Sequence, residues 1–303
     1  MKKTYLPIYI AFAVVICGFI VGSFFDYQIN DALFHDRDTF GLVVSTIGTT
    51  PGYGVMAFLG GGCLFLGLKN KVPHKAVRIV MYFLGAVAYG LSIYFSGKEF
   101  FGPNGFDYLG IQEFWGFFIV FPVQTGIAFL GYKMTSTTEN DKLWLIYIVM
   151  LLAILISLVA GVTLIKAIFH RPRFRTLSTT PGIDYYNWWE PCKNYKELMA
   201  TYNIISEEFK SFPSGHAGTC SVGMMATLFL PYINKKYMKA SLIAFCLGAA
   251  WLLLVAFSRM YVGAHFLSDV SMGSFLGVLC FFIGMIVIDN VKYFGVKEEP
   301  QLE

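Results

Sequence analysis

The residues of this chain that are best suited to chemistry lie in one run from Ser258 to Asp269, S-R-M-Y-V-G-A-H-F-L-S-D. It places Arg259, His265 and Asp269 in otherwise mostly apolar sequence, where charged and imidazole side chains are costly and indicate function. If the segment from His265 is helical, Asp269 lies one turn further on the same face. Its carboxylate can then accept the proton of one imidazole nitrogen and leave the other as a free lone pair. That arrangement suits a histidine nucleophile, and Arg259 offers a planar, permanently charged group for phosphate.

Two other stretches carry groups that suit the same chemistry. The stretch 166–175, K-A-I-F-H-R-P-R-F-R, ends a long apolar segment and contains Lys166 and Arg173. The stretch 211–216, S-F-P-S-G-H, opens another apolar segment. Phosphoryl transfer requires that charge on the equatorial phosphate oxygens be neutralised, and the cations Lys166, Arg173 and Arg259 can converge on one phosphate.

The end of the second stretch is suited to anion binding. The residues Ser214, Gly215 and His216 are expected at the N-terminus of a helix, where free backbone N–H groups and a partial positive charge attract anions. Gly215 lets the backbone approach an oxyanion closely, and the hydroxyl of Ser214 can donate a hydrogen bond.

Together the three stretches resemble the signature of the type 2 phosphatidic acid phosphatase (PAP2) superfamily. That signature reads K-x6-R-P, then P-S-G-H, then S-R-x5-H-x3-D. The second and third stretches match it residue for residue, whereas the first has Phe174 where the family has proline. Both cations of the first motif remain, because Lys166 and Arg173 keep the family spacing. The resemblance spans residues 166 to 269 and does not cover the N-terminal half.

The resemblance implies a mechanism and a set of site residues. It implies that His265 attacks phosphorus to form a phosphohistidine, with Asp269 orienting the ring. His216 then protonates the leaving oxygen and activates the water that releases phosphate. The implied phosphate-binding residues are Lys166, Arg173, Ser214, Gly215 and Arg259. No metal or other cofactor is expected, because the cations take the place that Mg²⁺ holds in kinases and no carboxylate cluster suggests a metal site.

The composition indicates a polytopic membrane protein. Of 303 residues, 56% are hydrophobic and only 14% are charged, whereas a soluble domain has about a quarter charged residues. The formal net charge of +4 is small and implies no nucleic-acid partner. The six cysteines show no metal-ligand spacing, and all but Cys192 fall in apolar segments, where we interpret them as small apolar residues of packed helices.

The apolar segments predict an all-α transmembrane helix bundle with about eight spans. A helix needs about 20 apolar residues to cross a bilayer. The expected spans are 5–25, 53–68, 77–96, 114–132, 143–166, 216–233, 240–257 and 266–289. The PAP2 resemblance implies a six-helix core, so two spans are additional. We expect residues 1–70 to hold the additional N-terminal helices, and residues 71–303 to form the PAP2-like catalytic domain with an extracytoplasmic loop over 174–212.

The distribution of lysine and arginine between the loops predicts the orientation of the bundle. Basic residues are enriched on the cytoplasmic side of a membrane protein. Eight spans place the basic residues of most loops and both termini on one face, with loop 26–52 on the other. These basic residues are Lys2, Lys3, Lys69, Lys71, Lys75, Arg78, Lys133, Lys142, Lys235, Lys236, Lys239, Lys292 and Lys297. The same count brings the three motifs together on the extracytoplasmic face, where the basic residues are mostly those of the motifs.

The long loop after the first motif carries aromatic residues from Tyr185 to Tyr195. Because Tyr and Trp favour the membrane interface, this loop is either an aromatic belt, which we favour, or a lid over a substrate headgroup. We expect Arg171 and Arg175 to be solvated or to face headgroups rather than to bind phosphate.

These observations predict a metal-independent integral membrane phosphatase that acts on a lipid phosphate or diphosphate. Phosphatidic acid, phosphatidylglycerol phosphate and a polyprenyl diphosphate all fit, and the other expected partners are membrane lipids. One alternative is a lipid phosphotransferase that uses the same intermediate. Another is a non-enzymatic transporter or scaffold on the same fold, against which the intact His216, His265 and Asp269 argue. The N-terminal Met-Lys-Lys before an apolar helix is compatible with a bacterial plasma membrane.

Overall fold

A computed structural model describes residues 5–101 and 114–290, and in this part of the chain the regular structure is helical. The predicted all-α bundle is therefore confirmed. Lys2, Lys3, Lys292 and Lys297, on which the predicted position of the termini depends, lie outside the described residues. The long helices are α1 (Tyr5–Leu33), α3 (Thr50–Leu68), α4 (Lys75–Lys98), α5 (Phe114–Thr135), α12 (Met238–Tyr261) and α13 (Leu267–Asn290). Helix α6 (Leu143–Leu155) continues through a π-helical segment, Ile156–Thr163, into α7 (Leu164–Phe169). The shorter helices are α2 (Thr39–Gly48), α8 (Phe174–Thr179), α9 (Tyr195–Tyr202), α10 (Gly215–Ala226) and α11 (Leu230–Ile233).

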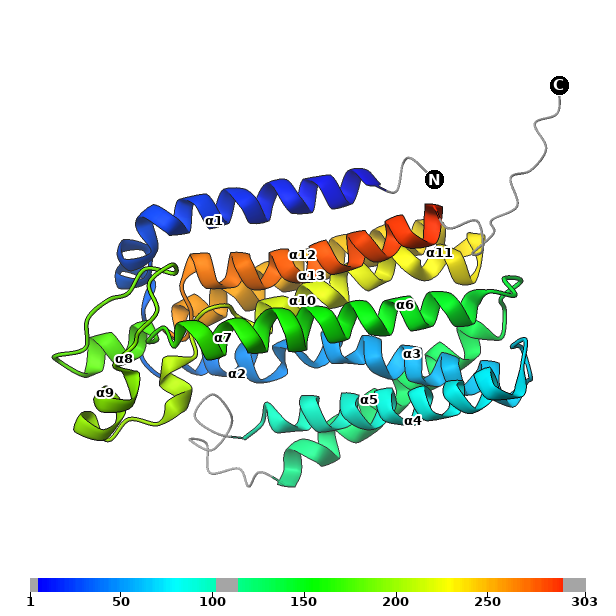
Figure 1. Ribbon diagram of the computed structural model, residues 1–303, viewed down its shortest axis with the longest axis horizontal. Coiled ribbons are helices and arrows are strands. Elements are labelled where there is room, and N and C mark those ends of the chain that lie inside the picture. Colours follow the sequence, from blue (N-terminus) through cyan, green and yellow to red (C-terminus); the bar gives the residue numbers. More distant parts are fainter. Residues whose placement is uncertain (1–4, 102–113, 291–303) are drawn as a thin grey trace.

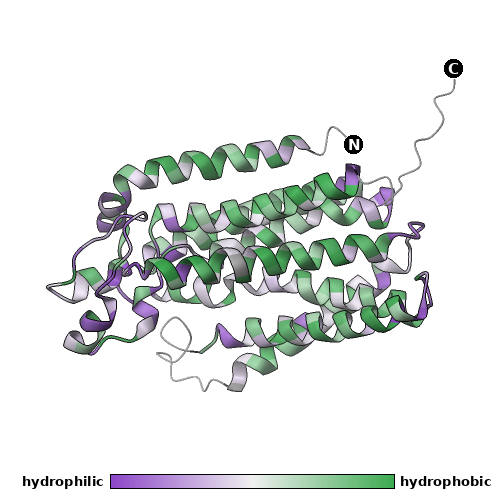
Figure 2. Ribbon diagram, in the orientation of Figure 1, coloured by the Kyte–Doolittle hydropathy of each residue, from purple (hydrophilic) through white to green (hydrophobic). Residues whose placement is uncertain are grey.

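The long helices run side by side along the long axis of the molecule, and the irregular segments gather at its two ends (Figure 1). Helices α8 and α9 lie at one end, and the connections that lead into α4 and α12 lie at the other. Figure 2 shows that hydrophilic residues concentrate at these ends, whereas the helices between them are largely hydrophobic. This distribution is that of a helical bundle in a bilayer, since the lipid core excludes exposed polar groups.

Seven helical segments of the described chain are long and apolar enough to cross a membrane. They agree with seven of the eight predicted spans, and the exception is 216–233. That stretch is helical from Gly215 to Ile233, as α10, a 3₁₀ turn at Thr227–Phe229 and α11, but it is not among the segments that are long and apolar enough to cross a membrane. Pro231 lies in the first turn of α11, and proline cannot donate the backbone hydrogen bond that would continue the helix. Helix α10 has 12 residues, of which nearly all are buried, and it packs inside the bundle against α3, α12 and α13.

The predicted loop 26–52 is also mostly helical. Helix α1 extends to Leu33, and α2 begins at Thr39 after Asp38, whose carboxylate accepts a hydrogen bond from the Gly41 N–H at 3.1 Å. Capping of this kind offsets the unpaired donors of a helix start. Helix α3 follows after Thr49, so residues 39–68 form one almost continuous helical segment that is longer than the predicted span 53–68.

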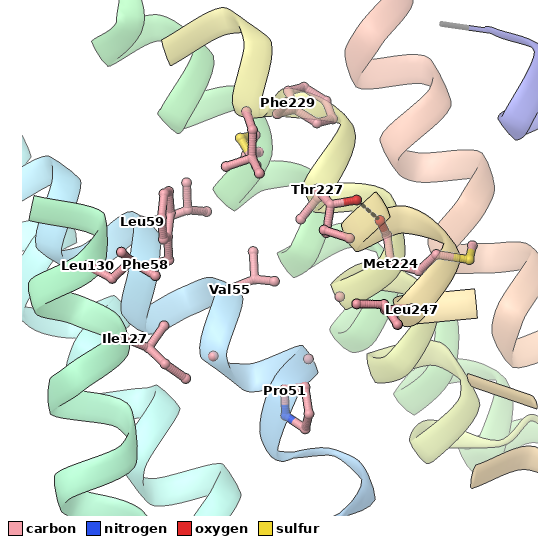
Figure 3. Close-up of a pocket in the computed structure, with 18 of the residues that line it drawn as sticks. Pro51, Val55, Phe58, Leu59, Ile127, Leu130, Met224, Thr227, Phe229 and Leu247 are labelled. Carbon is pink, nitrogen blue, oxygen red and sulfur yellow. Dashed lines mark hydrogen bonds between the residues drawn. The ribbon is translucent and has the colours of Figure 1, made fainter. Parts of the chain in front are cut away.

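An apolar cavity of about 490 Å³ lies between α3 and α5 on one side and α10 and α12 on the other (Figure 3). Its lining includes Val55, Phe58, Ile127, Met224 and Leu247. None of the eight predicted site residues lines it. Such a lining suits a hydrocarbon group and offers no charge for a phosphate.

Candidate active site

The loop between α12 and α13 presents His265. Gly263 adopts a left-handed backbone with φ of 63°, and a side chain there would meet Phe34 at 2.7 Å and the backbone nitrogen of Arg175 at 2.9 Å. Glycine is therefore required at this turn. The amide of Asn30, on α1, donates to the His265 carbonyl at 3.0 Å. The backbone that carries His265 is thus placed by contacts from both the first motif and the N-terminal helix.

The imidazole of His265 is buried, and its Nδ1 lies 2.7 Å from the carbonyl oxygen of Ser211. A carbonyl oxygen only accepts hydrogen bonds, so Nδ1 carries the proton and Nε2 keeps its lone pair. The carboxylate of Asp269 lies 3.8 Å from Nδ1, beyond hydrogen-bond distance. The sequence predicted that Asp269 accepts this proton, but in the structure the Ser211 carbonyl does so. Burial lowers the pKa of His265 well below its ordinary value, and the charges of Lys166 and Arg259 add to this against the opposing effect of Asp269.

Asp269 organises the backbone around this histidine. One of its oxygens accepts from the Ser211 hydroxyl at 2.5 Å and from the Phe266 N–H at 2.8 Å. The other accepts from Arg171 Nη1 at 2.6 Å. Asp269 therefore fixes both the segment that carries His265 and the residue whose carbonyl holds the proton of His265.

Arg171 lies at the centre of a buried ionic network, so the prediction that it is solvated or faces headgroups was wrong. It is 1% exposed, pairs with Asp269 and pairs with Asp26 of α1 at 3.0 Å. Asp26 in turn accepts from the backbone and hydroxyl of Ser268. The guanidinium also stacks 4.0 Å from the ring centre of Phe266. The two carboxylates compensate the charge of the buried guanidinium. Removal of any one of these three groups would leave a buried charge without compensation.

We expect Arg171→Met to destabilise the protein strongly, because it leaves Asp26 and Asp269 as unpaired buried carboxylates. Removing one partner of a buried ion pair costs about 3–5 kcal/mol of the free energy of unfolding. Thermal unfolding in detergent measures this loss. The exposed Arg78 of α4 provides the control, since Arg78→Met removes the same charge from the surface. Equal unfolding temperatures for the two variants would contradict the proposed network.

Arg173 and Lys166 are held by the segment that precedes the second motif. Arg173 donates to the carbonyl and the carboxylate of Glu207, at 3.0 and 2.9 Å, and Lys166 donates to the Lys210 carbonyl at 2.6 Å. Although burial raises the pKa of Glu207, the charges of Arg173 and Lys210 hold it below the ordinary value. Arg173 Nη1 is buried and has no hydrogen-bond partner in the described chain. One N–H group of Arg173 is therefore available for a further acceptor.

Arg259 is fully buried, and all three of its side-chain nitrogens lack a hydrogen-bond partner among the described residues. It interacts electrostatically with Arg173, Glu99 and Glu207. A buried charge without a partner costs free energy. A native structure that keeps such a group therefore has a reason for it, such as the binding of an ion. The nitrogens of Arg259 are therefore available to an acceptor that is not part of the described chain.

His216 and its neighbours open α10 as the sequence predicted. Ser214 caps this helix by accepting from the Ala217 N–H at 3.4 Å, so its own hydroxyl proton remains available to a ligand. A side chain at Gly215 would contact only Val162 within 4 Å, at 3.7 Å, so the protein leaves open space there. His216 interacts electrostatically with Arg259, His265, Arg173 and Lys166. The structure therefore brings the two histidines and the three predicted cations to one end of the bundle, as the span count and the loop charges predicted.

The aromatic loop packs onto the protein near this site. The Trp188 indole N–H donates to Ser23 of α1 at 2.9 Å, and its ring stacks on Phe212 with centres 5.8 Å apart. The Tyr185 hydroxyl accepts from Arg171 at 3.1 Å. Trp189, by contrast, is 48% exposed. Tyr185 therefore contacts the buried network directly, and Trp188 packs between α1 and the second motif.

Sequence reasoning missed Asp26, Ser211 and Glu99 as parts of this site. A carboxylate at the end of an apolar helix, as at Asp26, signals a buried partner. Ser211 lies in the second stretch, but it contacts His265 through its backbone carbonyl, which the type of side chain does not indicate. Glu99 follows α4 and lies 3.4 Å from His216, a contact that no local pattern indicates. In the described part of the chain, no group of three or more His, Cys, Asp or Glu residues is arranged to hold a metal ion, and metal independence stays a prediction.

Comparisons with known proteins agree with the motifs. A family model described as the PAP2 superfamily matches residues 142–293. A phosphatidylglycerophosphatase B of Bacillus subtilis is 33% identical over 99 residues, which cover 31% of this chain and 47% of the relative. A phosphatidylglycerophosphatase B of Haemophilus influenzae is 27% identical over 158 residues, which cover 46% of this chain and 65% of the relative. This chain thus spans less than two thirds of the length of either relative, and no solved structure matches it.

Proposed function

The chain belongs to the PAP2 superfamily, and from this premise we propose that it is a membrane phosphatase that hydrolyses a lipid phosphate or diphosphate. The observation that carries the proposal is the buried guanidinium of Arg259, whose nitrogens have no acceptor in the described chain. It is grouped with Lys166, Arg173 and two imidazoles. A cluster of cations without enough protein acceptors is a site for an anion with several oxygens.

The proposed reaction begins with attack of His265 Nε2 on phosphorus. The neutral ring is favoured by burial, and the Ser211 carbonyl keeps the proton on Nδ1. The three cations and the N-terminus of α10 stabilise the charge that develops on the equatorial oxygens. His216 protonates the leaving oxygen and then removes a proton from the water that cleaves the phosphohistidine. The reaction so described does not require a metal ion.

A lipid substrate is supported by the position of the apolar cavity. Cys220, one turn beyond His216 on α10, belongs to the cavity lining, which continues to Ile233. At about 1.5 Å per helical residue, the length of α10, the 3₁₀ turn and α11 from Cys220 to Ile233 accommodates much of a lipid chain. Both relatives are phosphatidylglycerophosphatases by name, which supports a phosphatidylglycerol phosphate among the possible substrates.

The site is proposed to face the extracytoplasmic side of a bacterial plasma membrane. The connections that carry Lys69, Lys71, Lys142 and Lys235 lie at the end of the bundle opposite α8 and α9 (Figure 1). Basic loops favour the cytoplasm, so this end is assigned to the cytoplasm and the site to the other side. The division into additional N-terminal helices over 1–70 and a catalytic domain over 71–303 remains part of the proposal.

The test is a panel of substrates offered to the purified protein in detergent without added metal. We expect release of inorganic phosphate from phosphatidic acid, phosphatidylglycerol phosphate or a polyprenyl diphosphate, and much slower release from glycerol 3-phosphate, which has no lipid chain. A ³²P-labelled lipid separates hydrolysis from transfer to a second lipid. The proposed hydrolase activity would be overturned if no lipid released phosphate and the label either stayed on the substrate or passed to a second lipid.

A further inference from the structure

Glu99 brings a carboxylate to the active site from outside the region that the family model matches. It directly follows α4, Lys75–Lys98, whereas the match begins at residue 142. Its Oε2 lies 3.4 Å from Nε2 of His216, and the two side chains are 24% and 11% exposed. Glu99 also faces Arg259, the cation without hydrogen-bond partners in the described chain.

The surroundings of His216 decide which ring nitrogen keeps its proton. Nε2 lies 3.1 Å from the carbonyl oxygen of Ser45, in addition to the Glu99 carboxylate. The Ser45 carbonyl only accepts a hydrogen bond, so Nε2 carries a proton. The proton that moves during catalysis must therefore be the one on Nδ1.

Burial, and after it the charges of its neighbours, lower the pKa of His216 and so disfavour its protonated form. From the other elements it is faced by Arg259 on α12, Arg173 and Lys166 of the first motif, and the second imidazole, His265. A general acid must nevertheless carry two ring protons before it donates one. Glu99 is the nearby carboxylate that can balance this charge. Burial raises the pKa of Glu99 to about 7, against the lowering effect of Arg259.

We propose that Glu99 is the positioning carboxylate of His216, which fixes the proton on Nε2 and stabilises the imidazolium. The proposal rests on the proposed phosphatase function. In the first step, the imidazolium gives its Nδ1 proton to the leaving alkoxide oxygen as the P–O bond breaks and the His265–phosphorus bond forms. In the second step, Nδ1 takes a proton from the water that attacks phosphorus, and the bond to His265 breaks. Nε2–H is retained throughout, held between Glu99 and the Ser45 carbonyl.

The test compares two substrates in the variant Glu99→Gln. An alkyl phosphate ester has a poor leaving group that needs a proton, whereas p-nitrophenyl phosphate has a good one that does not. General acid catalysis contributes about 10²–10⁴-fold, so we expect kcat/KM to fall about 100-fold or more for the alkyl ester. We expect kcat/KM for p-nitrophenyl phosphate to fall less than about threefold. The reason is that kcat/KM reports only the first chemical step, in which this leaving group needs no proton.

The pH profile gives a second readout. In Glu99→Gln the imidazolium of His216 loses a stabilising anion, so its pKa falls. We therefore expect the decrease of kcat/KM for the alkyl ester at alkaline pH to begin at a lower pH than in the wild type. Glu99→Asp is expected to recover part of the activity. The exposed Glu190 in the loop of the first motif serves as control, and Glu190→Gln is expected to change neither substrate more than about twofold.

The outcomes separate the two proposals. Equal losses for both esters, or an unchanged alkyl ester activity, in an active wild-type protein would overturn the role of Glu99 alone. A wild type that releases phosphate from neither ester nor any lipid would overturn the phosphatase, and the role of Glu99 with it. We expect the variants to unfold within a few degrees of the wild type. If Glu99→Gln is unstable, Glu99→Asp provides the folded comparison.

Discussion

Substituting His265 by alanine is expected to abolish phosphate release while the protein stays folded. The ring of His265 supplies the free Nε2, and in the proposed mechanism no other group can replace a lost nucleophile. Loss of a nucleophile in a concerted site costs on the order of 10⁴-fold or more in kcat. The measurement is phosphate release from the best lipid of the panel, together with thermal unfolding in detergent.

A trapping experiment identifies the intermediate directly. Wild-type protein quenched in alkali during turnover of a ³²P-labelled lipid is expected to carry label on histidine, and His265→Ala is expected to carry none. The exposed His35, which stacks on Tyr261 with ring centres 4.4 Å apart, is the matched control, and His35→Ala should retain label and most activity. More than about 1% residual activity in the folded His265→Ala protein would argue for another nucleophile.

Substituting Arg259 by methionine is expected to lower activity and to preserve or raise stability. The guanidinium is buried without a hydrogen-bond partner in the described chain, so its removal relieves an uncompensated charge. The same removal takes away a group that stabilises the transition state. Loss of one such donor costs about 10²–10³-fold in kcat.

Phosphate binding provides a test of this variant that does not depend on turnover. A ligand that binds the folded state raises the unfolding temperature, so inorganic phosphate is expected to stabilise the wild type more than Arg259→Met. Arg175, which pairs with Glu208 at the edge of the site, is the matched control, and Arg175→Met should keep the response to phosphate. If Arg259→Met unfolded at a clearly lower temperature, the guanidinium would have a structural role instead.

The sequence alone determined the chemistry and its place along the chain. Charged groups in apolar sequence are costly enough to mark function, so His265, His216 and the three cations stand out from their spacing and their apolar surroundings. The length of the apolar segments likewise indicates a helical membrane bundle, because a bilayer accepts few other structures. The span count and the loop charges together predict that the three stretches meet at one end.

Tertiary structure alone decided how each of these groups is held. Asp269 and His265 are one helical turn apart, as predicted, but the proton on Nδ1 goes to the carbonyl of Ser211. Arg171 has the sequence context of a solvated cation, and only the packing of α1 places Asp26 against it. Glu99 reaches His216 from a helix more than a hundred residues earlier in the chain. Spacing along a helix reports only neighbours on that helix, whereas hydrogen-bond partners and buried ion pairs depend on which distant backbones pack together.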